Sequence, residues 1–262
     1  MNQISSQQAL AQIKNMGIAY VMEADSLRYL IEDEETVECW LHEDMLITVN
    51  PCRDTTFIVV LPLHNTFDVD ALLALVSEQK QKISMLVNVQ ALSDSFIQTL
   101  DRAMESLFIY ERTLIDYVHT HSTAPVAIDA VRLLEARDKA AFVSCTQEQI
   151  KNRPPLAVLF DIFVNRHQGQ ILAAFDGERV VGYLSFNAVA DDVYDVDYIY
   201  VHPDMREQGI GKQLTSAYVQ YANAHGFRAY WSNAKNEESE KTALSCGFSV
   251  IRQAKKFISK DA

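Results

Sequence analysis

A glycine-rich loop in the second half of the chain follows a hydrophobic strand pattern and leads directly into a helix pattern. The stretch from Tyr198 to Ala222 reads YIYVHPDMREQGIGKQLTSAYVQYA, and its strand is expected to end at Val201. Such a loop directs successive backbone N–H groups at one point, where the dipole of the following helix also favours negative charge. Gly209 and Gly211 carry no side chain that would keep a ligand away from the main chain. The loop therefore predicts a site for a diphosphate.

Two common diphosphate motifs do not fit this loop. It lacks the GxxxxGK[ST] spacing of the P-loop. The GIG from Gly209 to Gly211 could begin a dinucleotide-binding fingerprint, but the third glycine is absent and no acidic residue ends the next strand. What remains is R-x-x-G-x-G, beginning at Arg206, with Lys212 as a second positive charge at its rim.

This motif, placed after a hydrophobic strand and a V-x-P turn, resembles that of the GCN5-related N-acetyltransferases (GNAT). In that family [RQ]-x-x-G-x-[GA] binds the pyrophosphate of acetyl-CoA. The resemblance implies acetyl-CoA as the acyl donor and a GNAT-like fold for residues 125–262. The donor-binding residues that it implies here are Ile199, Tyr200, Val201, Arg206, Glu207, Gln208, Gly209, Ile210, Gly211 and Lys212.

A second block supports the same resemblance. Asn236-Glu-Glu-Ser239, followed at the family's spacing by Gly247-Phe248, is similar to its N-x-x-A-x-x-x-Y-x-x-x-GF segment. By that similarity, Asn236 and Ser239 lie along the pantetheine and phosphate arm of the donor. Residues 131–138 and the hairpin around Asp176-Gly177 also match in order, so the resemblance covers about half of the chain. The segment SNAKNEES…CGF further resembles the corresponding segment of a subgroup that includes zwittermicin-type resistance acetyltransferases.

The residues that move protons are less clearly marked. Many family members have a tyrosine that protonates the leaving thiolate, but this chain has Ala243 there. A thiolate with a pKa near about 8.5 can leave without a dedicated acid, and Tyr200 or Tyr230 could also supply the proton. Asp197 stands where some polyamine acetyltransferases have a glutamate, so it is the candidate general base.

Strand alternation predicts that Asp195 and Asp197 share one face, which would bring two carboxylates to the substrate amine if that face lines the cleft. The alternative is that both point to solvent from a half-exposed strand. Backbone N–H groups from Ile199 to Val201 are candidates for polarising the thioester carbonyl without any particular side chain.

Other reactive side chains are better explained by packing or by turns. Cys246 has no His or Asp at a helpful local spacing, and His202 is interpreted as a turn residue beside the loop. His119 and His121 have no third ligand nearby, and the four cysteines form no CxxC pair, so no metal site is expected.

Residues 125–262 predict a mixed arrangement of helices and strands. Helices are expected over 138–145, 156–164, 211–225 and 239–246, and strands over 170–175, 179–186, 193–201, 229–232 and 248–257. Asp176-Gly177 suits a type I′ turn between the first two strands. The polar stretch HTHSTAP over 119–125 marks the boundary with the first half.

Residues 1–124 carry none of these motifs. A helix is expected over 5–30, a strand over 39–49 with a turn at His42–Asp44, and then strands and helices alternate over 57–63, 68–80, 83–89, 93–107 and 108–118. This order fits a smaller α/β domain, which is either a degenerate GNAT-like copy, as in acyltransferases of the glycine N-acyltransferase type, or a separate module for dimerisation or regulation.

Composition and charge narrow the function classes. With 48% hydrophobic and 22% charged residues, the chain of 262 residues is typical of a globular protein. Residues 1–124 hold 18 acidic and 7 basic side chains, and residues 125–262 hold 17 and 16, so a nucleic-acid partner is not expected. No signal peptide and no apolar run of roughly 20 residues is seen, which predicts a cytoplasmic protein with no membrane partner.

We therefore predict a two-domain α/β protein with mixed sheets, divided into residues 1–124 and 125–262. Its expected activity is that of a transferase that moves an acetyl group from acetyl-CoA to a primary amine, most simply of a small molecule, by direct attack. The alternative is an acyl-CoA sensor that binds the donor without turnover. Ala243 favours the sensor, whereas Asp197 and the intact loop favour the enzyme.

Overall fold

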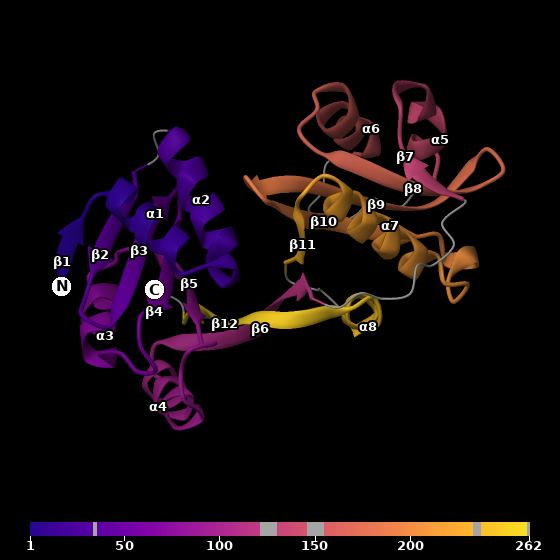
Figure 1. The fold of residues 1–262 in the computed structure, drawn as a ribbon. Coiled ribbons are helices and arrows are strands. Elements are labelled where there is room, and N and C mark those ends of the chain that lie inside the picture. The colour runs from indigo at the N-terminus through magenta and orange to yellow at the C-terminus, as the bar shows by residue number, and fades with distance from the viewer. Residues whose placement is uncertain (34–35, 121–129, 146–154, 233–236, 261–262) are drawn as a thin grey trace. The chain divides into compact units, whose positions relative to one another are not determined.

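The computed structural model describes residues 1–33, 36–120, 130–145, 155–232 and 237–260. It divides into two compact units (Figure 1). The first contains Met1–Asp116 and Ile251–Ala262, and the second contains Tyr117–Val250. The expected division at residue 124 differs from this one, because the C-terminal residues 251–262 pack with the first unit.

The first unit is a mixed sheet with helices on both faces. Its elements are β1 (Asn2–Ile4), α1 (Ser6–Asn15), α2 (Val21–Glu32), β2 (Glu38–Leu41), β3 (Met45–Cys52), β4 (Thr55–Pro62), α3 (Val69–Ser77), β5 (Lys82–Asn88), α4 (Asp94–Met104), β6 (Phe108–His119) and β12 (Phe248–Ser259), the last two being shared with the second unit. The strand order is β1-β2-β3-β4-β5-β12-β6.

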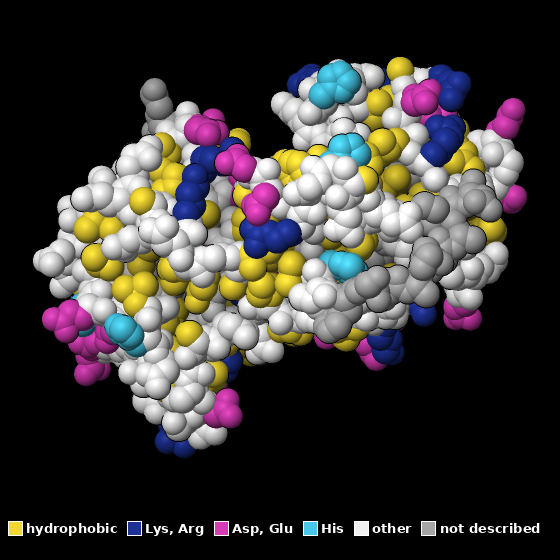
Figure 2. Space-filling model, in the orientation of Figure 1, with side chains coloured by type: hydrophobic (Ala, Val, Ile, Leu, Met, Phe, Trp, Pro, Cys, Tyr) yellow, Lys and Arg dark blue, Asp and Glu magenta, His cyan; other side chains and the backbone are white. Residues whose placement is uncertain are grey.

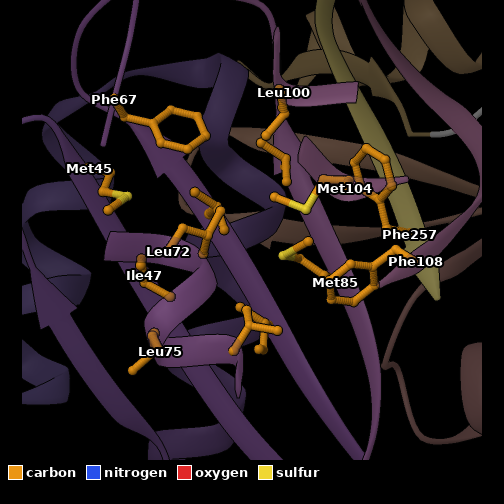
Figure 3. Close-up of a cluster of buried hydrophobic side chains, with 14 of the residues drawn as sticks. Met45, Ile47, Phe67, Leu72, Leu75, Met85, Leu100, Met104, Phe108 and Phe257 are labelled. Carbon is orange, nitrogen blue, oxygen red and sulfur yellow. The ribbon is translucent and has the colours of Figure 1, made fainter. Parts of the chain in front are cut away.

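Alternating side chains of the central strands build two cores. Leu46 joins Leu10 and Leu27 under α1 and α2, whereas its neighbour Ile47 joins the cluster under α3 and α4. Figure 3 shows the second cluster, to which the C-terminal strand contributes Phe257 beside Phe108. This contribution explains why the last residues of the chain belong to the first unit.

The second unit repeats the same succession of elements. They are β7 (Val131–Leu133), α5 (Lys139–Val143), α6 (Leu156–Phe160), β8 (Gln170–Asp176), β9 (Arg179–Ala190), β10 (Val193–Val201), α7 (Ile210–Ala224), β11 (Arg228–Trp231) and α8 (Glu237–Ser245), before β12. The strand order is β6-β11-β10-β9-β8-β7. Both halves of the chain therefore read β-α-α-β-β-β-α-β-α-β when 3-10 and π turns are set aside.

The last strand of each half lies beside the fifth strand of the other half. β12 pairs with β5 from Ala254↔Asn88 to Ile258↔Ser84 within the first unit. The end of β6 pairs with β11 at Val118↔Tyr230 within the second unit. Sequence position alone assigns each strand to its own half, so this exchange was not expected.

Two local predictions were wrong. The single helix expected over residues 5–30 is two helices, separated where Gly17 adopts a φ of 92°. The β8–β9 loop is Gly177-Glu178, and of these two residues only Gly177 has a positive φ, at 60°. A type I′ turn needs positive φ at both positions, whereas this pattern is that of a type II′ turn. The other elements are confirmed to within a few residues.

Helices cover both faces of the second sheet. Phe142 of α5 and Phe160 of α6 pack on Tyr183 and Tyr200. The start of α7 lies close to β9 on Gly182, where an added Cβ would stand 2.9 Å from the Tyr200 carbonyl oxygen and 3.1 Å from the Ile210 side chain. Only a glycine allows this approach, which places the start of α7 beside the end of β10.

Candidate functional site

The diphosphate loop predicted from the sequence connects β10 to α7. A 3-10 turn at Pro203–Met205 follows β10, and His202 caps it, because its Nδ1 accepts the N–H of Asp204 at 3.3 Å. Two left-handed residues follow, Glu207 with a φ of 62° and Gly209 with a φ of 79°. The chain is thereby turned into the first residues of α7, as the sequence predicted.

The start of α7 offers backbone N–H groups that no side chain caps. Gly209 is the N-cap residue and forms no side-chain cap, and the first intrahelical bond runs from the Gln213 N–H to the Gly209 carbonyl at 3.0 Å. The N–H groups of Ile210, Gly211 and Lys212 precede that bond and have no partner within the helix. An uncapped helix start with its positive dipole end fits a phosphate group.

The loop and the first turn of α7 carry exposed polar side chains. Arg206 donates from Nε to the Val201 carbonyl at 3.3 Å, which ties the loop to the end of β10. Gln208 donates to the Asp204 carbonyl at 3.3 Å, and Lys212 is exposed in the first turn of α7. The two cations and the helix dipole together favour an anion at this point.

β10 and β11 pair over a short register in the described part of the chain. Their parallel register runs from Val193↔Arg228 to Asp195↔Tyr230 and ends there. β10 continues to Val201, but only on its β9 side, with Ile199↔Leu184, Tyr200↔Tyr183 and Val201↔Gly182. Within the described residues, β10 therefore runs beyond Asp195 with β9 as its paired neighbour.

Asp195 and Asp197 have different partners. Asp195 is 5% exposed and accepts both the backbone N–H of Ser232, at 2.8 Å, and its hydroxyl, at 2.6 Å. Asp197 is half-buried and accepts the Ser185 hydroxyl at 3.0 Å. Between Val196 and Tyr198 the register shifts, and Asp197 is the extra residue of a bulge. Asp195 lies opposite Asn187 of β9 and Asp197 bonds Ser185, two residues away on the same strand, so both carboxylates lie on one face of the sheet, as predicted.

The Tyr200 ring lies within the hydrophobic core rather than on an open surface. Tyr200 is 8% exposed and its ring centroid is 5.7 Å from that of Tyr183. The neighbouring Ile199 and Val201 are half-buried. Of the later block, Asn236 lies outside the described residues, Ser239 is half-buried on α8, and Ala243 on the same helix is fully buried.

Comparison with known proteins decides which family this arrangement belongs to. Residues 132–248 match the model of the Acetyltransferase (GNAT) family. Residues 132–248 are a GNAT acetyltransferase domain. The GNAT domain makes the chain an acyltransferase whose acyl donor is an acyl-CoA.

Solved structures share the fold over nearly the whole chain. A GNAT-family acetyltransferase from Colwellia psychrerythraea is 15% identical, with a TM-score of 0.64 over 99% of both chains. A GCN5-related N-acetyltransferase from Sphaerobacter thermophilus is 12% identical, with a TM-score of 0.61 over 98% of this chain and 94% of that one. A tandem GNAT protein from the clavulanic acid biosynthesis pathway is 14% identical, with a TM-score of 0.59 over 98% and 96%. At these identities the likeness is one of fold. Among curated proteins there is no significant match.

Sequence reasoning missed three side chains that lie at the candidate site. Ser185 bonds Asp197, Ser232 bonds Asp195, and the Tyr218 hydroxyl contacts both β10 and β11. Ser185 was the one detectable signal, since it is a polar residue inside the apolar run VVGYLSF. Tyr218 lies on the buried face of an amphipathic helix and is indistinguishable from core in the sequence.

The remaining reactive side chains lie in surroundings that favour packing over chemistry. Cys246 is buried, and burial raises the pKa of its thiol, which keeps it protonated. Over the described ranges, no group of three or more His, Cys, Asp or Glu side chains is placed to hold a metal ion, and no helix there is long and apolar enough to cross a membrane. On the face in Figure 2, acidic and basic side chains are interspersed.

Proposed function

We propose that the GNAT domain transfers an acetyl group from acetyl-CoA to a primary amine of a small molecule. The observation that carries the proposal is the uncapped start of α7 at the end of β10, whose described pairing with β11 ends at Asp195↔Tyr230. The first feature suits the diphosphate of CoA, and the second leaves a strand edge for the pantetheine arm, whose amides pair as a peptide does. Arg206, Glu207, Gln208, Gly209, Ile210, Gly211 and Lys212 form the proposed diphosphate site, and Asn236 and Ser239 remain predicted contacts of the arm.

The proposed reaction is a direct displacement. The neutral amine nitrogen attacks the thioester carbonyl, the carbon–sulfur bond breaks, and CoA leaves as a thiolate while the new amide forms. Backbone N–H groups around Ile199 to Val201 stabilise the oxyanion. Asp197 takes the proton that the amine loses, and the Ser185 hydroxyl holds its carboxylate in place.

Tyr200 is the proposed proton donor to the thiolate, and it is the weaker of the two catalytic assignments. Its ring packs against Tyr183 in the core, where movement toward a ligand is restricted. Ala243 supplies no proton, since it ends at a buried methyl group. A thiolate that leaves without a dedicated acid is compatible with both facts.

The test begins with calorimetric titration of the protein with acetyl-CoA, free CoA and longer acyl-CoAs, followed by thiol release with a panel of amines. We expect acetyl-CoA to bind and at least one small amine to release CoA thiol. Asp197→Asn should lower kcat by about 10²–10⁴-fold without weakening donor binding, because only proton transfer is lost. Asp191→Asn, in the exposed turn between β9 and β10, is the matched control.

Each failure has its own meaning. Binding without amine-dependent thiol release would leave an acyl-CoA sensor. A folded protein that binds no CoA species would overturn the proposed donor site. An unaffected Asp197→Asn variant would remove the carboxylate from the mechanism.

The compartment also belongs to the proposal. All four cysteines are free, Cys39, Cys145 and Cys246 being buried and Cys52 exposed. Free thiols suit a reducing cytoplasm. We infer that the protein acts there.

A further inference from the structure

Arg179 brings a positive charge to the start of the diphosphate loop from a different strand. It is the first residue of β9 and is exposed. Its Nη2 atom lies 2.9 Å from Nε2 of His202, the residue that follows β10 and caps the turn leading into the loop. The backbone ties the same two segments together, because the His202 N–H donates to the Val181 carbonyl at 2.9 Å. The guanidinium is therefore held beside the loop.

Arg179 also lies on the face of the sheet that α7 covers. Its neighbour Val180 belongs to the core under α5 and α6. Successive side chains of a strand point to opposite faces, so Arg179 points to the α7 side. Gly182, further along β9, is the position over which α7 begins. The strand rises about 10 Å between the two residues, a distance that a long arginine side chain largely spans.

The positive charge of Arg179 has no acidic partner. Among the residues that the structure describes, its guanidinium contacts the imidazole and forms no ion pair with a carboxylate. Arg206 and Lys212 also form no such pair there, although Asp204 and Glu207 stand in the same loop. Three cations without ion-pair partners at one end of the sheet favour a ligand with more than one phosphate group.

CoA carries one anionic group besides its diphosphate, the 3′-phosphate of its ribose. A phosphate monoester holds about −1.5 to −2 charges at pH 7, and a guanidinium can bond two of its oxygens at once. The uncapped N–H groups of α7, with Arg206 and Lys212 beside them, suit the diphosphate. Arg179 meets the loop at its beginning, near His202 rather than Gly209. The remaining phosphate of the donor therefore suits Arg179.

The first unit has neither the arginine nor the histidine at the corresponding positions. β3 corresponds to β9 in the succession of elements, and its first residue is Met45, which is fully buried. β4 corresponds to β10, and Leu63 follows it where His202 follows β10. The pair thus occurs in the half of the chain that also has the uncapped helix start.

We propose that Arg179 is a further donor-binding residue whose guanidinium, positioned by His202, binds the 3′-phosphate of acyl-CoA. This inference rests on the function proposed above. It makes the protein selective for CoA over donors that end in the same diphosphate and pantetheine but lack the 3′-phosphate.

The test compares acetyl-CoA with its 3′-dephospho form in calorimetric titrations of the wild type, Arg179→Gln and Arg228→Gln. Arg228 is the matched control, an exposed arginine opposite Val193 at the start of β10, where it pairs with Asp192 at 2.7 Å. We expect the wild type to bind acetyl-CoA at least about tenfold more tightly than the 3′-dephospho form. Arg179→Gln should lose this preference through weaker binding of acetyl-CoA alone, whereas Arg228→Gln should keep it.

The outcomes separate this inference from the proposed function. A wild type that binds both donors equally would overturn the inference, and so would a folded Arg179→Gln variant that keeps the preference; the proposed function would then still stand. Equal weakening of both donors in Arg179→Gln would place the guanidinium at the diphosphate and overturn the 3′-phosphate assignment. A wild type that binds neither donor would overturn both. Thermal unfolding checks that Arg179→Gln is folded, as the exposed position of Arg179 predicts.

Discussion

Gly209 meets two requirements of the loop because it has no Cβ atom. Its φ of 79° is strained for a side chain, yet an added Cβ would meet no atom of the described residues within 4 Å. The space beside it is thus free for the diphosphate. We expect Gly209→Ala to lower stability by about 1–2 kcal/mol through backbone strain and to weaken acetyl-CoA binding at least about tenfold.

Gly226 provides the matched control for that prediction. It follows α7 at the opposite end, with a φ of 78° and equally open surroundings. Gly226→Ala should therefore cost similar stability, as measured by thermal unfolding, and leave the calorimetric affinity unchanged. Equal affinities of the two variants would show that the loop does not bind the donor.

At the residue scale, the sequence indicates backbone sites better than side-chain roles. Gly209 was predictable because a left-handed position favours glycine whatever the surroundings. The bulge at Asp197 was not, since nothing local to VYDVDYIYV marks an extra residue. The contacts of Ser185 and Ser232 join residues far apart in the chain, so no local pattern encodes them.

At the element scale, β12 is fastened to the first unit by a buried ion cluster. The Arg252 guanidinium bonds Asp116 of β6 at 2.6 Å and also bonds Glu23 of α2, and all three side chains are almost fully buried. Arg252→Met leaves two buried carboxylates without their cation. We expect the free energy of unfolding to fall by about 3–5 kcal/mol in denaturant titrations.

Two further variants test the contribution of the buried ion cluster to stability. Lys255→Met, also on β12, breaks a more exposed pair with Asp101 and should cost about 1 kcal/mol or less.

Burial raises the pKa of Glu23 above its usual 4.5, against the opposing effect of Arg252. The folded state then keeps a proton that the unfolded state has lost, so stability falls as pH rises through that window. Glu23→Gln should make the free energy of unfolding vary less with pH, because the titrating carboxyl is gone. If Glu23→Gln lost as much stability as Arg252→Met, the assignment of this pH dependence to Glu23 would be contradicted.

Strand and helix types were predictable where the apolar period was regular. The helices expected from residues 68 and 93 begin there because Asp68 and Ser93 cap them, each side chain accepting an N–H of the first helical turn. The break at Gly17 was missed because apolar residues continue at helical spacing on both sides of it. The strand exchange was missed because β6 and β12 choose partners by tertiary packing, which their own sequences do not specify.

The whole molecule carries two copies of one succession of elements but one proposed donor site. In the first unit, Asp68 occupies the N-cap position that Gly209 holds in the second, and its carboxylate accepts the Ala71 N–H at 2.9 Å. Asp70 follows in the first turn of α3. Two carboxylates at a helix start repel a diphosphate, and the continuous β4–β5 ladder leaves no strand edge for the arm.

One acetyl-CoA should therefore bind per chain, at the second unit only. Gly209→Asp gives α7 the N-cap residue of α3, and aspartate tolerates a left-handed φ better than most side chains. We expect calorimetry to find one site in the wild type and none in the variant, because the new carboxylate repels the diphosphate and competes for the helix N–H groups. Thermal unfolding confirms that the variant is folded. A second site in the wild type would show that the first unit also binds the donor despite its capped helix and closed ladder. A single site that remains in Gly209→Asp would show that a carboxylate at the N-cap does not repel the diphosphate.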